Sequence, residues 1–283
     1  MKIIDHPECQ TLVIGAIIGD CIGQPYEFPK SKRIRHKNFP LFLPGSRFTD
    51  DTVMTVALMK ALIDEKKIGE ADYGNHFKEF AVKYPDAGYG GRFKQWTKGE
   101  LLGDSFGNGA AMRISPAGYL LSESLESLLC VATNITACSH NTDYAIKTAQ
   151  AVARGIRRGL LGFDMSDIKK SIEDILGDKI FRPSEYDICY NLLKNSFSAS
   201  FPSVHQAIAC FLVSESVEDA IREAVACGQD SDTQAAIAAS LALAYYKELP
   251  AEIIKGMPDL PDEFIQIIAK FSQAYNVPKI KLV

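Results

Sequence analysis

The hydrophobic pattern along the chain has the period of α-helices. Apolar residues recur every three to four positions in many segments, whereas the strict alternation of apolar and polar residues that marks a half-buried strand is scarce. The clearest apolar face is made of Ala145, Ile146, Ala149, Val152, Ala153 and Ile156. The helix that carries it is predicted to end at Arg157 to Gly159. This pattern predicts an all-α fold.

Start and stop signals give approximate bounds for the other helices. Lysines followed by glycine mark an end, and Ser216 with Asp219 three positions later marks a beginning. Predicted helices run from Asp51 to about Gly69, from Tyr73 to Lys83, from Ala110 to Arg113, from Val217 to Ala226 and from Gln234 to Tyr246. Two more helical patterns lie between Phe163 and Phe201, and short helices bounded by prolines fill the last part of the chain.

The segment from Thr11 to Gly23 is apolar and carries glycine at every fourth position, Gly15, Gly19 and Gly23. An apolar run could be a strand, but this one is long, and its glycines fall on one side of a helix. We therefore predict a buried helix whose glycine face lets another helix approach closely.

Two acidic clusters each come directly before an apolar helical segment. The first is Thr49-Asp50-Asp51-Thr52 and the second is Asp230-Ser231-Asp232-Thr233. Either one alone is most simply a helix cap, because Thr and Asp are favoured N-cap residues. The repetition favours a joint site for hard divalent cations, which bind carboxylate, hydroxyl and water oxygens.

Three other features are candidates for chemistry, each with a simpler alternative. Glu27 lies between two aromatic residues at the start of a basic loop, and could equally be a surface carboxylate paired with one of those bases. The glycine-rich turn from Gly103 to Gly109 precedes a helix and could hold a phosphate, although most such loops are only turns. His140 precedes a helix and could contact an anion, although a structural histidine is the commoner case.

Composition excludes several classes of protein. With 283 residues and 47% hydrophobic content the chain can form one large core, and we expect a single domain over residues 1–283. A net charge of -4 lacks the basic footprint of a nucleic-acid binder. Seven scattered cysteines suggest neither disulfides nor a zinc site but a reducing compartment. Without a signal peptide or a bilayer-spanning apolar run, we expect a soluble cytoplasmic protein that does not bind membranes.

In order along the chain, these motifs resemble the ADP-ribosylglycohydrolase family, which includes the hydrolase of ADP-ribosylated dinitrogenase reductase and eukaryotic ADP-ribosylhydrolases. The resemblance covers about residues 10 to 246, and six ordered matches are much less frequent by chance than one. The matching residues are Gly19-Asp20 with Gly23 and Glu27, Thr49 to Thr52 with Met54, Gly88 to Gly90, Ser105 to Arg113, Ser139-His140 and Asp230 to Thr233.

The resemblance implies a compact orthogonal multi-helix bundle with a central binuclear metal cleft that binds two Mg²⁺ ions, or Mn²⁺ in their place. The implied metal ligands are Thr49, Asp50, Asp51, Asp230, Asp232 and Thr233, and the implied catalytic residues are Glu27, Asp50 and Asp232. The residues expected around ADP-ribose are Tyr89 and Phe106 as stacking surfaces, Ser105, Gly107, Asn108 and Gly109 at the diphosphate and ribose, and His140 at the distal part.

The chain departs from the family pattern at four positions. Gln229 and Ala226 stand where the family usually has glycine and asparagine, and Ala239 and Leu243 stand where it usually has glycines. None of these supplies a metal oxygen, but we expect their side chains to narrow the space beside the site. The departures therefore bear on the choice of substrate.

The implied reaction is magnesium-dependent hydrolysis of an N- or O-glycosidic bond at ribose C1 of an ADP-ribosylated protein or other acceptor, with release of ADP-ribose. Nucleic acid fits only as a modified substrate, and we expect a monomer. The acceptor could be arginine, serine, a nucleobase, acetate or another ADP-ribose. We expect the loop from Glu27 to Arg47 to cover the cleft and to determine which acceptor is used. Two alternatives are a catalytically silent ADP-ribose binder and an enzyme for isoprenoid diphosphates.

Overall fold

The computed structural model describes residues 1–27, 34, 36–64, 72–182, 185, 188, 191 and 198–283, and it confirms the all-α prediction. The first helices are α1 (Gly15–Gly23), α2 (Asp50–Asp64), α3 (Tyr73–Lys83), α4 (Gly91–Thr97), α5 (Gly109–Arg113) and α6 (Leu125–Ala137). They are followed by α7 (Asp143–Leu160), α8 (Met165–Leu176), α10 (Ser200–Leu212), α11 (Val217–Cys227), α12 (Ser231–Tyr246), α13 (Ala251–Gly256) and α14 (Asp262–Ala274). Short 3₁₀ helices are η1 (Ile3–Asp5), η2 (Pro7–Cys9), η3 (Leu12–Ile14), η4 (Gln24–Tyr26) and η6 (Ser115–Tyr119).

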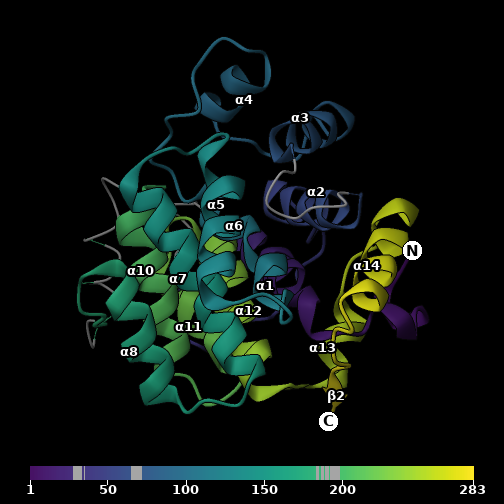
Figure 1. Ribbon diagram of the computed structural model, residues 1–283. Helices are drawn as coiled ribbons and strands as arrows, with labels where there is room; N and C mark the ends of the chain where they lie inside the picture. Colours follow the sequence, from purple (N-terminus) through teal and green to yellow (C-terminus); the bar gives the residue numbers. More distant parts are fainter. Residues whose placement is uncertain are drawn as a thin grey trace.

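Helices α1 and α12 cross at the centre of the molecule (Figure 1). A Cβ atom on Gly19 would lie only 2.2 Å from the carbonyl oxygen of Ala235, and one on Gly15 would lie 2.8 Å from that of Ala239. The two backbones can therefore touch only where α1 has glycine. This confirms the predicted close approach and identifies α12 as the partner.

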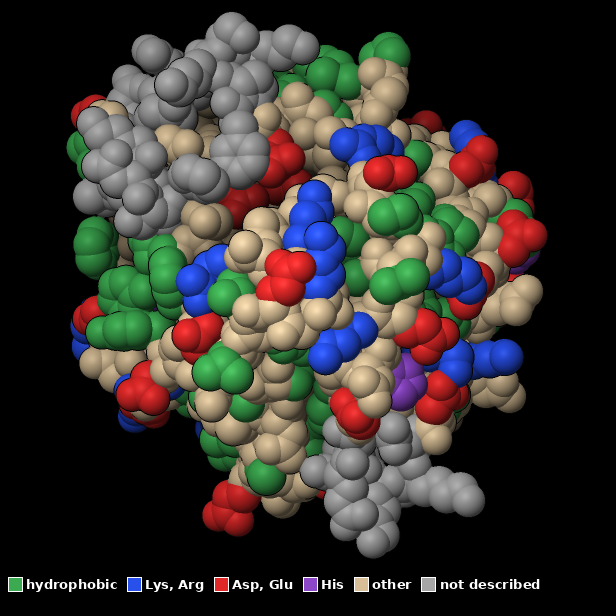
Figure 2. All heavy atoms as spheres, turned by 90° about the horizontal axis from the view of Figure 1, so that it is seen from above, with side chains coloured by type: hydrophobic (Ala, Val, Ile, Leu, Met, Phe, Trp, Pro, Cys, Tyr) green, Lys and Arg blue, Asp and Glu red, His purple; other side chains and the backbone are tan. Residues whose placement is uncertain are grey.

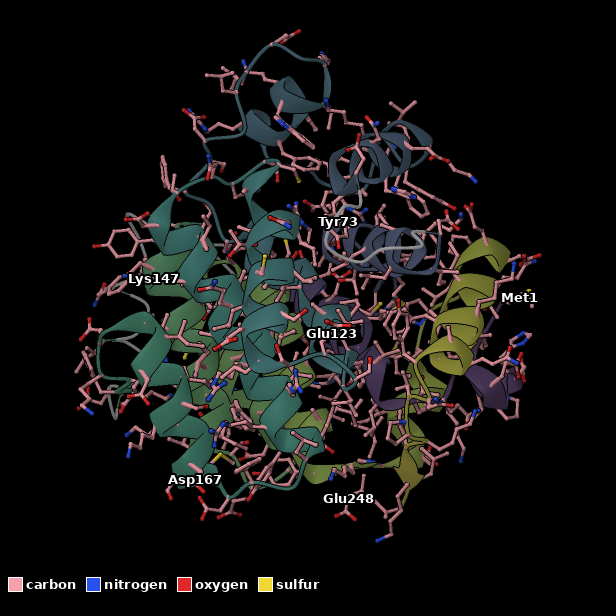
Figure 3. All side chains as sticks on the ribbon, in the orientation of Figure 1. Met1, Tyr73, Glu123, Lys147, Asp167 and Glu248 are labelled. Atoms are coloured by element: carbon pink, nitrogen blue, oxygen red, sulfur yellow. The ribbon has the colours of Figure 1, made fainter. Side chains whose placement is uncertain are left out.

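The remaining helices surround this central pair. Helix α7 packs against α6, α8, α10 and α12, and buries the alanine-rich face that the sequence predicts. On the other side, α2 lies between α3 and α14 (Figure 1). Charged side chains such as Lys147, Asp167 and Glu248 lie at the periphery, whereas the space between helices is filled with apolar side chains (Figure 3).

The two ends of the chain lie beside α13 and α14 (Figure 1). Strands β1 (Glu248–Leu249) and β2 (Lys281–Leu282) form a two-residue parallel pair in an otherwise helical fold. Leu260 N–H donates to the carbonyl of Met1 at 2.8 Å, which attaches the N-terminus to the segment before α14. No helix in the described ranges is both long enough and apolar enough to cross a membrane.

Most helix predictions are confirmed, with small shifts of their bounds. Helix α3 has the predicted bounds, and Ser216 caps α11 by accepting from the N–H of Asp219 at 3.0 Å. Helix α12 begins three residues earlier than predicted, at Ser231. The predicted end of the helix that begins at Asp51 falls on residues 65–71, which lie outside the described residues.

Candidate active site

The first acidic turn owes its shape to an aspartate on another helix. Asp20, fully buried on α1, accepts four hydrogen bonds from the backbone and hydroxyl groups of Thr49 and Thr52, at 2.5 to 3.1 Å. Because Asp20 satisfies these groups at the start of α2, the carboxylates of Asp50 and Asp51 are not needed as caps. The capping alternative therefore holds for Thr49, whose Oγ1 accepts from the N–H of Asp51 at 3.3 Å, but not for the carboxylates of Asp50 and Asp51.

The second acidic turn meets the first at the start of α12. Thr233 Oγ1 donates to Asp51 Oδ2 at 3.2 Å, although 182 positions separate the two residues. Asn108 Nδ2 donates to Asp230 Oδ2 at 2.8 Å, which connects the glycine-rich turn to the same centre. The two clusters that repeat in the sequence therefore form one site.

Glu27 joins this site from the end of η4. Oxygens of Glu27, Asp230 and Asp232 all lie within 4.8 Å of one another, a spacing that can hold a metal ion. This grouping puts Glu27 beside two of the predicted metal ligands, while Asp50 and Asp51 lie on the adjoining wall. The acidic centre thus has at least two parts, as a pair of cations requires.

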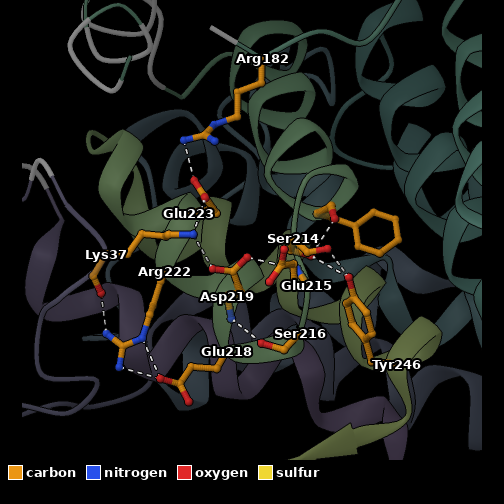
Figure 4. A network of polar contacts seen from close by, with 11 residues as sticks. Lys37, Arg182, Ser214, Glu215, Ser216, Glu218, Asp219, Arg222, Glu223 and Tyr246 are labelled. Atoms are coloured by element: carbon orange, nitrogen blue, oxygen red, sulfur yellow. Dashed lines mark hydrogen bonds and ion pairs between the residues drawn. The ribbon is translucent and has the colours of Figure 1, made fainter. Parts of the chain in front are cut away.

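Helix α11 contacts the segment that follows Glu27, where Lys37 forms ion pairs with Asp219 and Glu223 (Figure 4). Arg222 on α11 donates at 2.7 Å to the carbonyls of Lys37 and of Phe39, and its guanidinium lies 5.1 Å from the centre of the Phe39 ring. Phe39 contacts the ring of Tyr26, the residue before Glu27, edge-on at 4.9 Å. The other end of α11 leads directly into Gly228 and Asp230.

The acidic centre forms the base of a cavity of about 390 Å³. Figure 2, which views the molecule of Figure 1 from above, shows acidic side chains set back in a hollow of the surface. The described residues that line the cavity are Glu27, Asp50, Asp51, Met54, Gly88, Gly90, Gly91, Arg92, Phe93, Ser105, Phe106, Gly107, Asn108, Gly109, Met112, Arg113, His140, Ser198, Asp230, Asp232 and Thr233.

An isoprenoid diphosphate enzyme would need a further carboxylate one helical turn after Asp50, together with a large apolar cavity. The structure has Met54 at that position and carboxylates across the base of the cavity. The required carboxylate is missing, so this alternative has no support.

Burial and mutual repulsion raise the pKa values of the clustered carboxyl groups. Burial and the negative charges of Asp230 and Asp20 raise the pKa of Glu27 to about 7. Burial, with Asp20 and Asp230 again adding repulsion, raises the pKa of Asp50 to about 8. The pKa values of Asp51 and Asp232 are also raised, for the same reasons.

The chemistry of these oxygens fits divalent cations. Asp51 Oδ1 is buried and has no hydrogen-bond partner among the described residues, which is costly for a carboxylate unless a cation accompanies it. Carboxylate and hydroxyl oxygens are the ligands that hard ions such as Mg²⁺ prefer. A bound cation would also offset the repulsion that raises the pKa values of the carboxyl groups.

The wall that carries the glycine-rich turn is built from two backbone pairings. The turn at Gly107 pairs with Ala199, and Asn108 N–H donates to the carbonyl of Ser198 at 2.9 Å. Asp104 pairs with His140 in the same way. These pairings place backbone and small polar groups along the cavity, with the ring of Phe106 59% exposed at its edge.

The structure brings most of the predicted site residues into the cavity. Thr49 and Tyr89 are the exceptions, since neither is among the described lining residues. The hydroxyl of Thr49 is engaged by Asp20, and the ring of Tyr89 is buried and stacks on Phe93, with ring centres 5.4 Å apart. Phe93 is the ring that faces the cavity there, so Tyr89 can act only through it.

Sequence reasoning assigned no role to Asp20, Phe93 or Arg113. Asp20 belongs to the Gly19-Asp20 motif, and a carboxylate within an apolar glycine-rich helix is the signal that the sequence offers for it. Arg113 likewise lies at the end of the Ser105 to Arg113 match, but its burial cannot be seen in the sequence. Phe93 carried no signal that separates it from an ordinary core ring.

The four departures from the family pattern do not line the cavity. Gln229, Ala226, Ala239 and Leu243 are absent from the described lining residues, so the expectation that they narrow the space beside the site stays a prediction. Ala239 instead faces Gly15 in the contact between α12 and α1. Gln229 has a positive φ of 72°, a conformation that favours glycine, which gives a physical reason for glycine at this position.

Comparisons with known proteins agree with this geometry. A family model described as ADP-ribosylglycohydrolase matches residues 9–279. The chain is 25% identical to ADP-ribosylhydrolase ARH3 of Mus musculus, over 92% of this chain and 86% of that protein. It is 24% identical to ADP-ribosylarginine hydrolase Tri1 of Pseudomonas putida, over 91% and 73%. A solved structure titled ADP-ribosylglycohydrolase-related protein complex shares the fold, with a TM-score of 0.69, 20% identity and coverage of 95% and 98%.

Proposed function

The chain belongs to the ADP-ribosylglycohydrolase family, and from this premise we propose that it is a magnesium-dependent hydrolase acting on ADP-ribosylated acceptors. It cleaves the N- or O-glycosidic bond at ribose C1 and releases ADP-ribose. The observation that carries the proposal is the meeting of two distant acidic turns, with Thr233 3.2 Å from Asp51, at the base of a cavity that also contains Glu27.

The metal would be held by oxygens of both turns. Asp51, with its unpartnered Oδ1, and Asp50 face the cavity from α2, while Asp230, Asp232 and Thr233 face it from the start of α12. Thr49 Oγ1 lies 3.4 Å from Asp51 Oδ2, beside this set. When bound, a pair of divalent cations supplies Lewis acidity and orients ribose hydroxyls and a water.

Glu27 is suited to proton transfer. Hydrolysis places the oxygen of a water on ribose C1 and a proton of that water on the departing nitrogen or oxygen. A carboxylate at the base of the cavity, beside Asp230 and Asp232, can accept this proton from the water and return it to the departing atom. Glu27 therefore carries the proton from the water to the leaving atom.

The wall that carries the glycine-rich turn binds the remainder of ADP-ribose. Backbone groups of Gly107 to Gly109 and the hydroxyl of Ser105 offer hydrogen bonds to the diphosphate and ribose. The exposed ring of Phe106 offers a stacking surface, and His140 contacts the distal part. These contacts bind substrate and product alike, so they set affinity more than turnover.

The substrate carries ADP-ribose on a protein side chain or on another acceptor group. One relative bears a name that specifies ADP-ribosylarginine, so an arginine-linked substrate is the first to test. The described part of the loop from Glu27 to Arg47 contacts α11 through Lys37 and Phe39. Residues 28–33 and 35, on which the expected covering of the cleft depends, lie outside the described residues.

The deciding experiment measures release of ADP-ribose from arginine-, serine- and nucleic-acid-linked substrates. Each reaction is run with magnesium, with manganese and with a chelator. The expected result is release from at least one substrate class that stops with the chelator and returns with magnesium. Release that is unaffected by the chelator would contradict the metal requirement.

The same reactions separate an enzyme from a binding protein. ADP-ribose affinity is measured by calorimetry in the presence of magnesium. Tight binding without release from any substrate would support the catalytically silent alternative and overturn the proposed activity. Absence of both binding and release would overturn the ADP-ribose assignment itself.

A further inference from the structure

A fully buried arginine lies in the same part of the cavity wall as His140. Arg113 on α5 has no solvent exposure, and its guanidinium lies 4.0 Å from the centre of the Phe77 ring. Among the described residues no carboxylate lies within ion-pair distance of it. Burial lowers the pKa of Arg113 only to about 10, so it remains a cation at neutral pH. An unpaired buried cation is costly, which calls for an account of what it does.

Arg113 starts a short chain of hydrogen bonds that ends at His140. Arg113 Nη2 donates to Ser139 Oγ at 2.6 Å, and Ser139 Oγ lies 2.8 Å from His140 Nδ1. A guanidinium has no acceptor, so Ser139 must accept from Arg113. The buried hydroxyl of Ser139 also has a proton to donate, and Nδ1 is the acceptor for it among the hydrogen bonds of the described residues. Nδ1 is then unprotonated, and the ring proton of a neutral His140 lies on Nε2.

The Nε2 end of the imidazole faces the turn that lines the cavity. A Cβ atom added to Gly109 would lie 3.1 Å from Nε2, and one added to Gly107 would lie 3.7 Å from it. His140 itself is a lining residue, and within the described ranges its Nε2 has no hydrogen-bond partner. The donor is therefore left available on the cavity side.

We propose that Arg113 and Ser139 are positioning residues that hold His140 in its Nε2–H tautomer. In this tautomer Nε2–H donates a hydrogen bond to an acceptor atom of the bound nucleotide. The identity of that ligand rests on the proposed function, whereas the tautomer does not. The acceptor is an oxygen or ring nitrogen of the ADP-ribose moiety, because these are the atoms that a neutral N–H recognises.

The surrounding charges keep the imidazole neutral. Burial lowers the pKa of His140 well below its ordinary value, and the cations Arg113 and Arg92 lower it further. Arg92 forms a 2.7 Å ion pair with Asp104, whose backbone pairs with His140. The donor therefore persists across neutral pH without adding charge to the site.

The test reads the tautomer directly from ¹⁵N NMR of histidine side chains in the ligand-free protein at neutral pH. His140 is assigned by its absence from the spectrum of His140→Gln. In the wild type we expect Nδ1 to resonate as an unprotonated nitrogen and Nε2 as a protonated one. A protonated Nδ1, or an imidazolium, would overturn the proposal.

Variants separate positioning from folding. In Ser139→Ala both neutral tautomers of His140 should be populated, so that its two nitrogens show averaged shifts. ADP-ribose binding should weaken about 3- to 10-fold, as expected for one hydrogen bond. Ser115→Ala is the matched control, because Ser115 is also buried but lies off the described cavity lining, and its hydroxyl has no partner among the described residues. It should leave both tautomer and affinity unchanged. An unchanged tautomer in Ser139→Ala would contradict the proposed role of Ser139.

Arg113→Met tests the first link. Without the guanidinium, Ser139 Oγ is no longer oriented by a fixed donor and can turn to accept from Nδ1–H as well as donate to it, so we expect mixed tautomers at His140. If this variant does not fold, Ser139→Ala alone decides the proposal. Because the NMR result is obtained without substrate, a correct tautomer with no ADP-ribose release would overturn only the proposed function. Release with the wrong tautomer would overturn only this inference.

Discussion

At the scale of single residues, Glu27 has the most specific assignment. Its pKa of about 7 arises from burial and from the negative charges of neighbouring aspartates. Glu27→Gln keeps the shape of the side chain but cannot transfer a proton. We expect turnover to fall about 10²- to 10⁴-fold, while ADP-ribose affinity changes little. Steady-state kinetics and calorimetry measure the two effects, and wild-type turnover in this variant would remove the assigned role.

Asp232 is expected to act as a metal ligand. Asp232→Ala removes an oxygen that lies within 4.8 Å of oxygens of Glu27 and Asp230. We expect magnesium affinity to drop by more than about 10-fold, with activity lost in parallel. Isothermal titration with magnesium gives the affinity. The control is Asp259→Ala, which removes an exposed carboxylate off the described cavity lining, and full metal affinity in Asp232→Ala would exclude it as a ligand.

At the scale of elements, the contact of α1 with α12 depends on glycine. In Gly19→Ala the new Cβ would lie 2.2 Å from a backbone oxygen, which a side-chain movement cannot relieve. We expect the free energy of unfolding to fall by about 1–3 kcal/mol, as for other overpacked cores. Denaturant unfolding measures it.

The matched control for Gly19→Ala is Gly74→Ala in α3. There the nearest atom to the new Cβ is 3.5 Å away, an ordinary contact. Replacing glycine by alanine within a helix should raise the free energy of unfolding by about 0.5–1 kcal/mol. Equal effects at the two positions would show that close backbone approach is not the reason for glycine at position 19.

Helix α11 is expected to position Glu27 through Arg222. Arg222→Met removes both hydrogen bonds to the carbonyls of Lys37 and Phe39 but keeps most of the apolar stem. We expect the free energy of unfolding to fall by about 1–3 kcal/mol and turnover to fall more than substrate affinity. Glu218→Gln is the control, since it breaks only the partly exposed pair with Arg222 and should cost less than about 0.5 kcal/mol. A similar loss of turnover in both variants would argue against this positioning role.

At the scale of the whole molecule, the acidic centre links stability to pH and metal. Glu27 and Asp50 have raised pKa values in the folded protein, about 7 and about 8, so without metal the folded state binds protons that the unfolded state releases. In chelator, the free energy of unfolding should therefore fall as pH rises from about 4 to about 8. Magnesium should reverse this trend, because deprotonated carboxylates bind it better at higher pH.

Thermal unfolding at several pH values, with chelator and with magnesium, measures this linkage. The stabilisation by magnesium should grow with pH and should be much smaller in Asp232→Ala. Stability in chelator that rises over this pH range would contradict the clustering of uncompensated carboxylates.

Much of the molecule follows from the sequence by itself. The helical period, the caps and the glycine spacing determine local structure, because they act through neighbours within one or two turns. They predict the all-α class, the bounds of α3, α11 and most of α12, and the glycine face of α1. The two acidic turns are also visible in the sequence, because each lies at the start of an apolar helix.

Only the tertiary structure decided how these parts combine. Asp20 caps a helix that begins thirty residues later, and Thr233 reaches Asp51 across most of the chain, contacts that no local pattern encodes. Tyr89 and Phe93 are both aromatic, and burial alone put Phe93 on the cavity and Tyr89 behind it. Local propensity is set by a few neighbouring residues, whereas a site is set by which distant surfaces pack together, and here that depended on the close approach of α1 and α12.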